Sequence, residues 1–364
     1  MSDLTFEIKS HPAPRSREER AALMANPGFG KVFTDHMVVA RYSAGRGWHD
    51  ARIQAREAIP LDPAAAVLHY AQEIFEGLKA YRTADGGAAL FRPDANARRF
   101  RRSAERMAMA PFPEDAFVEA VRKLVEIDRD WIPDTPDGSL YLRPFMIASE
   151  AFLGVKPASE YLFITIASAV GSYFKDPTGT VTVWISDHFT RAAPGGTGAA
   201  KCGGNYAASL AAQAEAAGQG CAQVVFLDAA ERRYVEELGG MNVFFVFEDG
   251  TLVTPPLSDS ILPGITRDSV ITLAREAGLT VREEPYTIDA WRTDVRQGRL
   301  TEAFACGTAA VITPIGTVKG REESFTIGNG KAGPVAQRLR SLLVDIQRGK
   351  AKDAHGWFQK VVEF

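Results

Sequence analysis

The sequence predicts an α+β fold in two halves. Segments with the β-branched and aromatic composition of strands outnumber helical segments, and the helices fall between them at irregular intervals without an internal repeat. The length of 364 residues exceeds that of one typical domain. A stretch rich in Gly, Pro, Asp and Thr, "GSYFKDPTGT", is the best candidate for a linker. We therefore expect an N-terminal domain over residues 1–170, a linker over 171–180 and a C-terminal domain over 181–364.

The N-terminal half is expected to begin with an irregular arm over residues 1–30. Residues 31–54 predict a strand pair with glycines at the turn. Residues 64–93 predict a short helix and then a hairpin that bends at an Asp-Gly-Gly sequence. Two amphipathic helices and then two buried strands follow, over residues 96–108, 115–133, 139–148 and 161–170.

The C-terminal half alternates apolar strand segments with helices in the same irregular way. Strands are predicted over residues 181–187, 222–229, 242–256 and 302–318, where the third segment turns at an Asp-Gly pair. Helices are predicted over residues 205–218, 266–278 and 334–349, from alanine-rich composition or apolar residues at helical spacing.

Composition excludes several classes of protein. A net charge of −3 lacks the basic excess that nucleic-acid binding requires. The longest apolar run, near residues 161–174, is too short and interrupted to span a membrane. Three cysteines without a Cys-x-x-Cys pair and scattered histidines predict neither a metal site nor a disulfide framework, so we expect a reducing, cytoplasmic location. The charged start of the chain does not have the pattern of a secretory signal.

The segment "GGTGAAKCGGNYAAS" surrounds Lys201 with glycines. A lysine becomes a nucleophile when burial or a nearby cation removes its proton, and glycines would let a flat ligand lie against the backbone. Tyr206 follows five residues later and could reach the same ligand with its phenol. The alternative is an ordinary solvated lysine in a loop.

Four further positions are candidates for ligand contacts, each with an ordinary alternative. Glu237 enters an apolar segment and would need a cationic partner, such as a protonated ring nitrogen, unless it is a solvated strand end. Thr266 follows Pro-Gly at a predicted helix N-cap, where phosphate binds well, or it is a plain cap. Thr308 lies among small residues that would let an anion touch the backbone, or that simply pack tightly. Arg99 has the planar side chain that binds phosphate well, and the alternative is that it lies on a solvated helix face.

Together these candidates describe one ligand. It would carry a phosphate, an aldehyde for the lysine and a ring nitrogen for the glutamate. Pyridoxal 5′-phosphate has all three groups, and a lysine with an acidic partner on the ring nitrogen is its usual protein setting.

The sequence also resembles the branched-chain amino acid aminotransferases, which are fold-type IV pyridoxal-phosphate enzymes. The resemblance runs almost from end to end. It is carried by the ordered blocks "FTDHM", "LHYAQEIFEGLKAYR", "FRPDANARRFRRSAERM", "SLYLRP", "KCGGNYAASL", "EELGGMN", "LPGITRDS" and "FACGTAAVITP". It implies a smaller N-terminal α/β domain and a larger C-terminal pseudo-barrel domain that carries the lysine.

The resemblance implies a role for each matching residue. Lys201 would bind the cofactor covalently and later carry the substrate's Cα proton, Tyr206 would bond the phenolic oxygen, and Glu237 would pair with the ring nitrogen. The cofactor phosphate would be held by Arg99, Ile265, Thr266 and Thr308. The substrate carboxylate would be held by Thr308 and Ala309, helped by Tyr141 and Arg143. The side-chain pocket would be lined by Phe29, Tyr70, Phe75, Tyr173 and the loop from Leu153 to Val155.

In this family Tyr70 and the 153–155 loop come from a partner subunit, so the resemblance implies a homodimer. The implied reaction is transamination between leucine, isoleucine or valine and 2-oxoglutarate by a ping-pong mechanism. A D-amino acid transaminase or an aminodeoxychorismate lyase of the same fold is the alternative. A phosphate-binding protein without catalysis, in which Lys201 is only a salt-bridge donor, is the alternative from another class.

Overall fold

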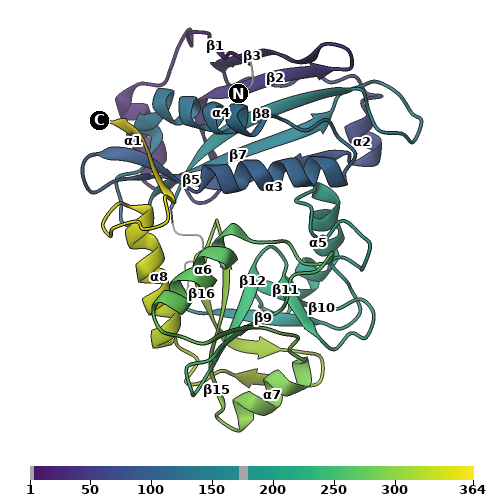
Figure 1. Ribbon diagram of the computed structural model, residues 1–364, viewed down its shortest axis with the longest axis vertical. Helices are drawn as coiled ribbons and strands as arrows, with labels where there is room; N and C mark the ends of the chain where they lie inside the picture. Colours follow the sequence, from purple (N-terminus) through teal and green to yellow (C-terminus); the bar gives the residue numbers. More distant parts are fainter. Residues whose placement is uncertain (1–3, 172–178) are drawn as a thin grey trace. The chain divides into compact units, whose positions relative to one another are not determined.

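The computed structural model describes residues 4–171 and 179–364, which form two compact units (Figure 1). Each unit combines a mixed β-sheet with helices, which confirms the predicted α+β class. Unit 1 contains residues 4–171 and the segments Ala200–Gly203 and Asp345–Phe364, and unit 2 contains residues 179–199 and Gly204–Val344. The predicted linker lies mostly in residues 172–178, outside the described residues.

Unit 1 is built on a nine-stranded sheet in the order β1-β3-β2-β8-β7-β5-β6-β18, with β4 paired to β7. Its neighbouring strands run antiparallel apart from β1 and β3. The strands are β1 Glu7–Ile8, β2 Val32–Ser43, β3 Gly47–Ala55, β4 Glu73–Phe75, β5 Leu78–Arg82, β6 Gly87–Phe91, β7 Ser139–Ala148, β8 Glu160–Val170 and β18 Phe358–Glu363.

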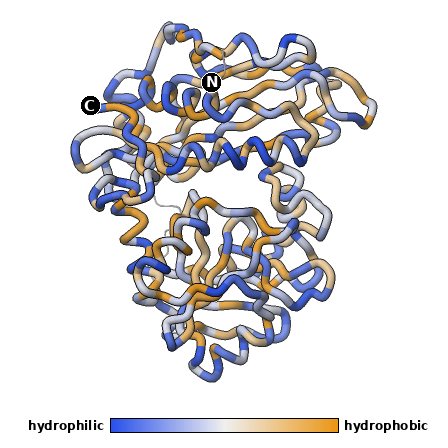
Figure 2. The backbone as a smooth tube through the Cα atoms, in the orientation of Figure 1, coloured by the Kyte–Doolittle hydropathy of each residue, from blue (hydrophilic) through white to orange (hydrophobic). Residues whose placement is uncertain are grey.

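The two faces of this sheet bury different side chains, because successive residues of a strand point to opposite faces. On β2, Val38 and Ala40 belong to the main core, whereas Met37 and Val39 belong to a smaller cluster. Helices α3 Pro93–Arg106 and α4 Glu114–Ile127 pack their apolar faces into the main core. The rest of α3 is strongly hydrophilic, as Figure 2 shows along the helix.

The arm expected over residues 1–30 is not wholly irregular. Helix α1 Arg17–Met24 begins with a capping box, in which Ser16 Oγ accepts a hydrogen bond from Glu19 N and Ser16 N donates to the Glu19 carboxylate. None of its residues is buried, and it contacts the main core through the partly buried Met24, so its apolar periodicity is a weak signal. The predicted short helix is α2 Ala66–Tyr70, and a 3₁₀ turn, Arg129–Trp131, follows α4.

Unit 2 contains a second nine-stranded sheet, in the order β11-β10-β9-β16-β15-β12-β13-β14 with β17 paired to β16. Its strands are β9 Val181–Ser186, β10 Gln223–Leu227, β11 Val235–Leu238, β12 Asn242–Phe247, β13 Leu252–Thr254, β14 Val281–Glu283, β15 Leu300–Gly307, β16 Val311–Lys319 and β17 Ser324–Thr326. Its helices are α5 Gly203–Gly218, α6 Ile265–Glu276 and α7 Ile288–Arg296, and α8 Pro334–Gln347 leads back to unit 1.

Candidate active site

The Lys201 segment is fixed in unit 1. Phe75 N, on β4, donates to Lys201 O over 2.9 Å, and Lys201 N donates to Ser103 Oγ, on α3, over 3.0 Å. The flanking side chains of Ala200 and Cys202 are buried in the main core of unit 1. Lys201 is therefore held at the end of β4 and beside α3, and the alternative of a lysine in a solvated loop is wrong.

Two glycines of this segment do not serve the predicted purpose, which is to let a flat ligand lie against the backbone. A Cβ on Gly203 would overlap the carboxylate of Glu73, which accepts a hydrogen bond from Gly203 N. A Cβ on Gly198 would overlap the backbone of Ser260. At both positions the protein itself fills the space, so these glycines allow close packing around the lysine rather than the approach of a ligand.

The environment of Lys201 favours its neutral form. Its Nζ lies 4.8 Å from the ring centroid of Phe75, with the guanidinium groups of Arg99 and Arg143 near it. Burial, followed by the charge of Arg99, lowers the pKa of Lys201 to about 8 against the opposing effects of Glu76 and Tyr141. An amine with this pKa is partly unprotonated near neutral pH, as a nucleophile or general base requires.

Arg99 is 4% exposed and forms an ion pair with Glu76, whose side chain is fully buried. Arg99 Nε donates to Glu76 Oε1 over 2.7 Å and Arg99 Nη2 donates to Oε2 over 2.8 Å. Such paired, charge-assisted bonds fix the plane of the guanidinium. The alternative of a solvated helix face is therefore wrong for this arginine.

Four of the predicted substrate-binding residues lie together in unit 1. The rings of Phe29 and Tyr141 are 5.0 Å apart in an edge-on arrangement. Arg143 Nη2 donates to the Tyr141 hydroxyl over 2.9 Å, and its guanidinium lies 4.7 Å from the Phe75 ring centroid. A Cβ on Gly77 would overlap the same hydroxyl, so the glycine leaves the space that Tyr141 fills. The group offers apolar surfaces and one cation to a small ligand.

Tyr70 and the 153–155 loop also meet, on the exterior of unit 1. The Tyr70 hydroxyl donates to Leu153 O. Tyr70 is 38% exposed and Val155 is 87% exposed, which is unusual for large hydrophobic side chains. Tyr173 lies outside the described residues.

Glu237 lies on β11 of unit 2 and is only 2% exposed, so the alternative of a solvated strand end is wrong. Its Oε1 accepts from Arg191 Nη1 at 2.7 Å and from Leu262 N at 3.0 Å. Arg191 is also buried, and it donates to the carbonyl oxygens of Ser260 and Gly198. These donors give hydrogen bonds and a counter-charge to a carboxylate that is removed from water.

The remaining predicted contacts of unit 2 lie on two helices and one turn. Helix α6 begins at Ile265, so Gly264 is the N-cap and Thr266 is the second helical residue, which corrects the predicted cap. The extended backbone of Gly264 lies against Asn242 Oδ1, which leaves no room for a capping side chain. Thr308 and Ala309 form the turn between β15 and β16. Tyr206 lies in the first turn of α5, with its ring beside Gly240.

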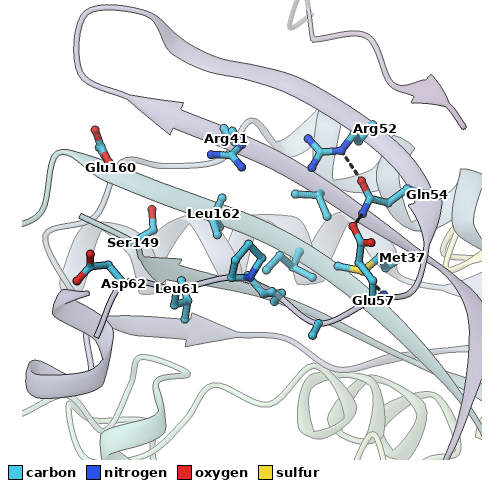
Figure 3. Close-up of a pocket in the computed structure, with 15 residues that line it drawn as sticks. Met37, Arg41, Arg52, Gln54, Glu57, Leu61, Asp62, Ser149, Glu160 and Leu162 are labelled. Atoms are coloured by element: carbon cyan, nitrogen blue, oxygen red, sulfur yellow. Dashed lines mark hydrogen bonds between the residues drawn. The ribbon is translucent and has the colours of Figure 1, made fainter. Parts of the chain in front are cut away.

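A groove on unit 1 lies away from these residues (Figure 3). It is formed by β2, β3, β8 and the chain from Glu57 to Asp62, with Met37 and Leu162 at its floor and Arg41 and Glu160 at its rim. Its lining contains none of the predicted site residues. Over residues 4–171 and 179–364, no group of His, Cys, Asp and Glu could hold a metal ion, and no helix is long and apolar enough to cross a membrane.

The sequence patterns identify Arg99 and Glu237 as candidates but do not identify their ion-pair partners, which are Glu76 and Arg191. Glu76 has a signal in the sequence, because it is the one acidic residue in the otherwise apolar stretch "IFEGL", and a buried carboxylate needs a partner. Arg191 has no such signal, because nothing local connects it to a carboxylate 46 residues later.

Comparison with known proteins gives a family model and close relatives. A family model for class IV aminotransferases matches residues 73–318. A probable branched-chain-amino-acid aminotransferase from Streptomyces coelicolor is 55% identical over 358 residues, which cover 98% of this chain and 99% of the relative. The branched-chain-amino-acid aminotransferase of Mycolicibacterium smegmatis is 53% identical and covers 98% of each chain.

Solved structures give the same similarity in three dimensions. The branched-chain amino acid aminotransferase of Escherichia coli aligns with a TM-score of 0.73 at 30% identity, over 88% of this chain and 99% of the other. The branched-chain amino acid aminotransferase of T.th., solved with pyridoxamine 5′-phosphate, aligns with a TM-score of 0.72 at 31% identity, over 88% of this chain and 98% of the other.

Proposed function

The chain belongs to the class IV aminotransferases, within their branched-chain-amino-acid group, and from this premise we propose that it moves amino groups from leucine, isoleucine or valine to 2-oxoglutarate. The products are the branched 2-oxo acid and glutamate, formed in two half-reactions of a ping-pong cycle. The observation that carries the proposal is the environment of Lys201, a packed lysine whose pKa is lowered to about 8 between two arginines and a buried carboxylate.

The residues present fit pyridoxal 5′-phosphate as the cofactor. An amine of lowered pKa suits its aldehyde, and a buried carboxylate held by Arg191 suits its ring nitrogen. A buried arginine and a helix N-terminus without a side-chain cap suit its phosphate. When bound, this cofactor draws electrons from the Cα of an amino acid and so makes the Cα–H bond acidic.

The chain's own residues then divide the work. Lys201 would hold the cofactor through Nζ, and the same atom, once free, would accept the proton from the substrate Cα. Glu237 would pair with the ring nitrogen, and Tyr206 would bond the phenolic oxygen. The phosphate would be held by Arg99, Ile265, Thr266 and Thr308.

The substrate contacts follow from the same assignment. Thr308 and Ala309 hold the α-carboxylate, with Tyr141 and Arg143. Phe29 and Phe75 offer apolar surface to a branched side chain, and the guanidinium of Arg143, which donates to the Tyr141 hydroxyl, would also donate to the side-chain carboxylate of glutamate. One methylene changes binding in an apolar pocket by only about 1–3 kcal/mol, so we expect leucine, isoleucine and valine all to react.

A reductive labelling experiment tests the proposal. The protein supplied with pyridoxal 5′-phosphate should absorb visible light, and borohydride should attach the cofactor to Lys201, as read by peptide mass spectrometry. Leucine or valine added alone should change the spectrum in a single half-reaction. A colourless protein without label on Lys201 would support the phosphate-binding alternative, and a response to D-amino acids alone would support a D-amino acid transaminase.

We further propose that the enzyme is a homodimer in which Tyr70 and the Leu153–Val155 loop serve the partner's site, with Tyr173 in the same pocket. The support is that Tyr70 and Leu153 bond to each other on the exterior of unit 1 and that Leu153, Val155 and Tyr70 are exposed.

The free, buried cysteines Cys202, Cys221 and Cys306 support a cytoplasmic location.

Mixing two inactive variants tests this arrangement. Lys201→Ala and Tyr70→Ala proteins are unfolded, combined in equal amounts and refolded. If Tyr70 acts across the interface, each mixed dimer regains one complete site, and random pairing gives about a quarter of the wild-type sites. If the refolded mixture is no more active than the Tyr70→Ala protein at half its concentration, Tyr70 serves its own subunit. Sedimentation of the wild-type protein as a monomer would reject the dimer itself.

A further inference from the structure

The carboxylate of Glu76 is the centre of a buried hydrogen-bond network in unit 1. Besides the two bonds from Arg99, its Oε2 accepts from Asn96 Nδ2 at 2.7 Å and from Gly77 N at 3.1 Å. Asn96 and Arg99 are three residues apart on α3 and therefore lie on the same side of the helix. The backbone N–H of Glu76 also donates to Pro144 O over 2.7 Å, which fixes the residue between β4 and β5.

This network has no evident purpose in stability alone. Burying an arginine and a carboxylate costs much of what their attraction returns, and an apolar pair of similar size is often as stable. The pair instead gives the guanidinium a single orientation, because both Nε and Nη2 are engaged by one carboxylate. A fixed arginine loses less side-chain entropy when an anion binds.

The charges around Lys201 also depend on Glu76. Burial raises the pKa of Glu76, but the charges of Arg99 and Lys201 and the bonds from Arg99 and Asn96 outweigh it and hold the pKa below its usual range. The charged or titratable groups that act on Lys201 are Arg99, Glu76, Tyr141 and Arg143. Glu76 is thus the ionised carboxylate that offsets two arginines at the lysine.

We propose that Glu76 is a positioning residue of the transaminase, which fixes Arg99 for the cofactor phosphate and balances the charge at Lys201. The inference rests on the proposed function, in which Arg99 binds that phosphate. Glu76 itself touches neither substrate nor cofactor in this assignment, and it acts through Arg99 and Lys201.

The first test measures phosphate recognition without the lysine chemistry. Cofactor-free protein is titrated with pyridoxine 5′-phosphate and with pyridoxine, neither of which has an aldehyde, and binding is followed by calorimetry. We expect Glu76→Gln to weaken binding of the phosphate compound about tenfold, the loss of one charge-assisted interaction. Binding of pyridoxine should stay the same. Equal affinities of wild type and Glu76→Gln for the phosphate compound would overturn the inference.

The second test measures Lys201 in the same cofactor-free protein. Trace labelling with acetic anhydride over a pH series, read by mass spectrometry of the Lys201 peptide, gives the midpoint of its titration. We expect a midpoint near pH 8 in the wild type and a lower one in Glu76→Gln, because the variant removes the negative charge that opposes Arg99. An unchanged midpoint would overturn the charge-balancing part of the proposal.

Two further variants separate position from charge. Glu76→Asp keeps the charge but shortens the reach, so the Lys201 midpoint should return toward the wild-type value while phosphate binding stays weak. Glu302→Gln is the matched control, because this carboxylate is also buried but caps the start of α8 through Val335 N and Ala336 N. It should change neither measurement.

The design also keeps the inference distinct from the proposed function. If wild-type protein binds neither compound, the proposed function fails, whereas a difference confined to Glu76→Gln concerns the inference alone. If Glu76→Gln does not fold, Asn96→Ala removes one bond to Oε2 while the carboxylate keeps its charge, so it should weaken binding of the phosphate compound by a smaller factor and leave the Lys201 midpoint unchanged. Asn96→Ala with wild-type affinity for pyridoxine 5′-phosphate would then reject the proposal.

Discussion

The two units each bury one carboxylate against one arginine, but the pairs are built differently. In unit 1 the arginine depends on the carboxylate, since Glu76 receives both Nε and Nη2 of Arg99. In unit 2 the carboxylate depends on the arginine. Arg191 donates to Glu237 through Nη1 and is also anchored on the backbone carbonyls of Ser260 and Gly198.

This difference indicates which member of each pair acts on a ligand. A side chain that is bonded by a neighbour, where that neighbour is itself bonded to the backbone, is positioned by the neighbour. By this reasoning Arg99 is the residue that acts on a ligand in unit 1, and Glu76 positions it. In unit 2 Glu237 acts on the ligand, and Arg191 positions it. The predictions that follow test this division, from the largest expected effect to the smallest.

Lys201→Ala is expected to have the largest effect, because it removes the group that binds the cofactor and moves the Cα proton. Turnover of leucine with 2-oxoglutarate should fall by at least about a thousandfold, as for loss of a nucleophile or general base. Circular dichroism should be unchanged, since the lysine's backbone bonds to Phe75 and Ser103 remain. Retained turnover would contradict the assignment of the base.

Glu237→Gln is expected to slow the Cα proton step on the order of a hundredfold, because a neutral amide no longer keeps the ring nitrogen protonated. Stopped-flow absorbance with leucine deuterated at Cα measures this step through its isotope effect. Glu236→Gln is the control, since it alters the neighbouring carboxylate, which bonds Ser260 Oγ instead. A wild-type rate in Glu237→Gln would show that the carboxylate has no part in the chemistry.

Arg191→Met should be more destabilising than Arg99→Met. Without Arg191 the buried Glu237 loses its counter-charge, which costs about 3 kcal/mol or more of unfolding free energy. Without Arg99, Glu76 keeps its bonds from Asn96 and Gly77, so the loss should be smaller. Urea unfolding followed by tryptophan fluorescence gives both values. The opposite order would refute the contrast between the two pairs.

The pH dependence of stability gives the last prediction. In the unfolded chain Lys201 has its ordinary pKa of 10.5, whereas in the folded cofactor-free protein the pKa is about 8. Between these values the unfolded state binds more protons, so the contribution of Lys201 to stability rises with pH. The Lys201→Met protein should therefore be more stable than the wild type below pH 8. The difference in their unfolding free energies should shrink as the pH approaches 10.5. A difference that does not change with pH would show that folding leaves the Lys201 pKa unaltered.

The sequence predicts where helices and strands lie better than it predicts which strands pair with each other. The strand pair over residues 31–54 and the strand over 139–148 are found as β2, β3 and β7, because apolar strand-type runs and turn glycines are local signals. Helix α7 lacks a prediction, although Thr287 caps it and Ile288 and Trp291 give it a buried face. The pairing of β18 with β6 joins segments about 270 residues apart, which no local pattern encodes.

The candidate site shows the same limit. Residue types and glycine spacing mark Lys201, Glu237 and Arg99 as candidates, and the structure shows that Arg99 and Glu237 are buried in ion pairs. Arg191 became visible only in the structure, because folding brings it to Glu237 from another segment. The use of Gly198 and Gly203 for packing against Ser260 and Glu73 likewise depends on tertiary contacts.

The long-range pairing of β18 also has a consequence for biosynthesis. Strand β6 obtains its outer neighbour only when residues 358–363 leave the ribosome, after all the other helices and strands of the described chain have been made. Until then one margin of the unit 1 sheet offers unsatisfied amide and carbonyl groups to other nascent polypeptides. Chaperones that bind extended segments would be most useful during that interval, and a premature stop codon in this stretch would be expected to yield an insoluble product.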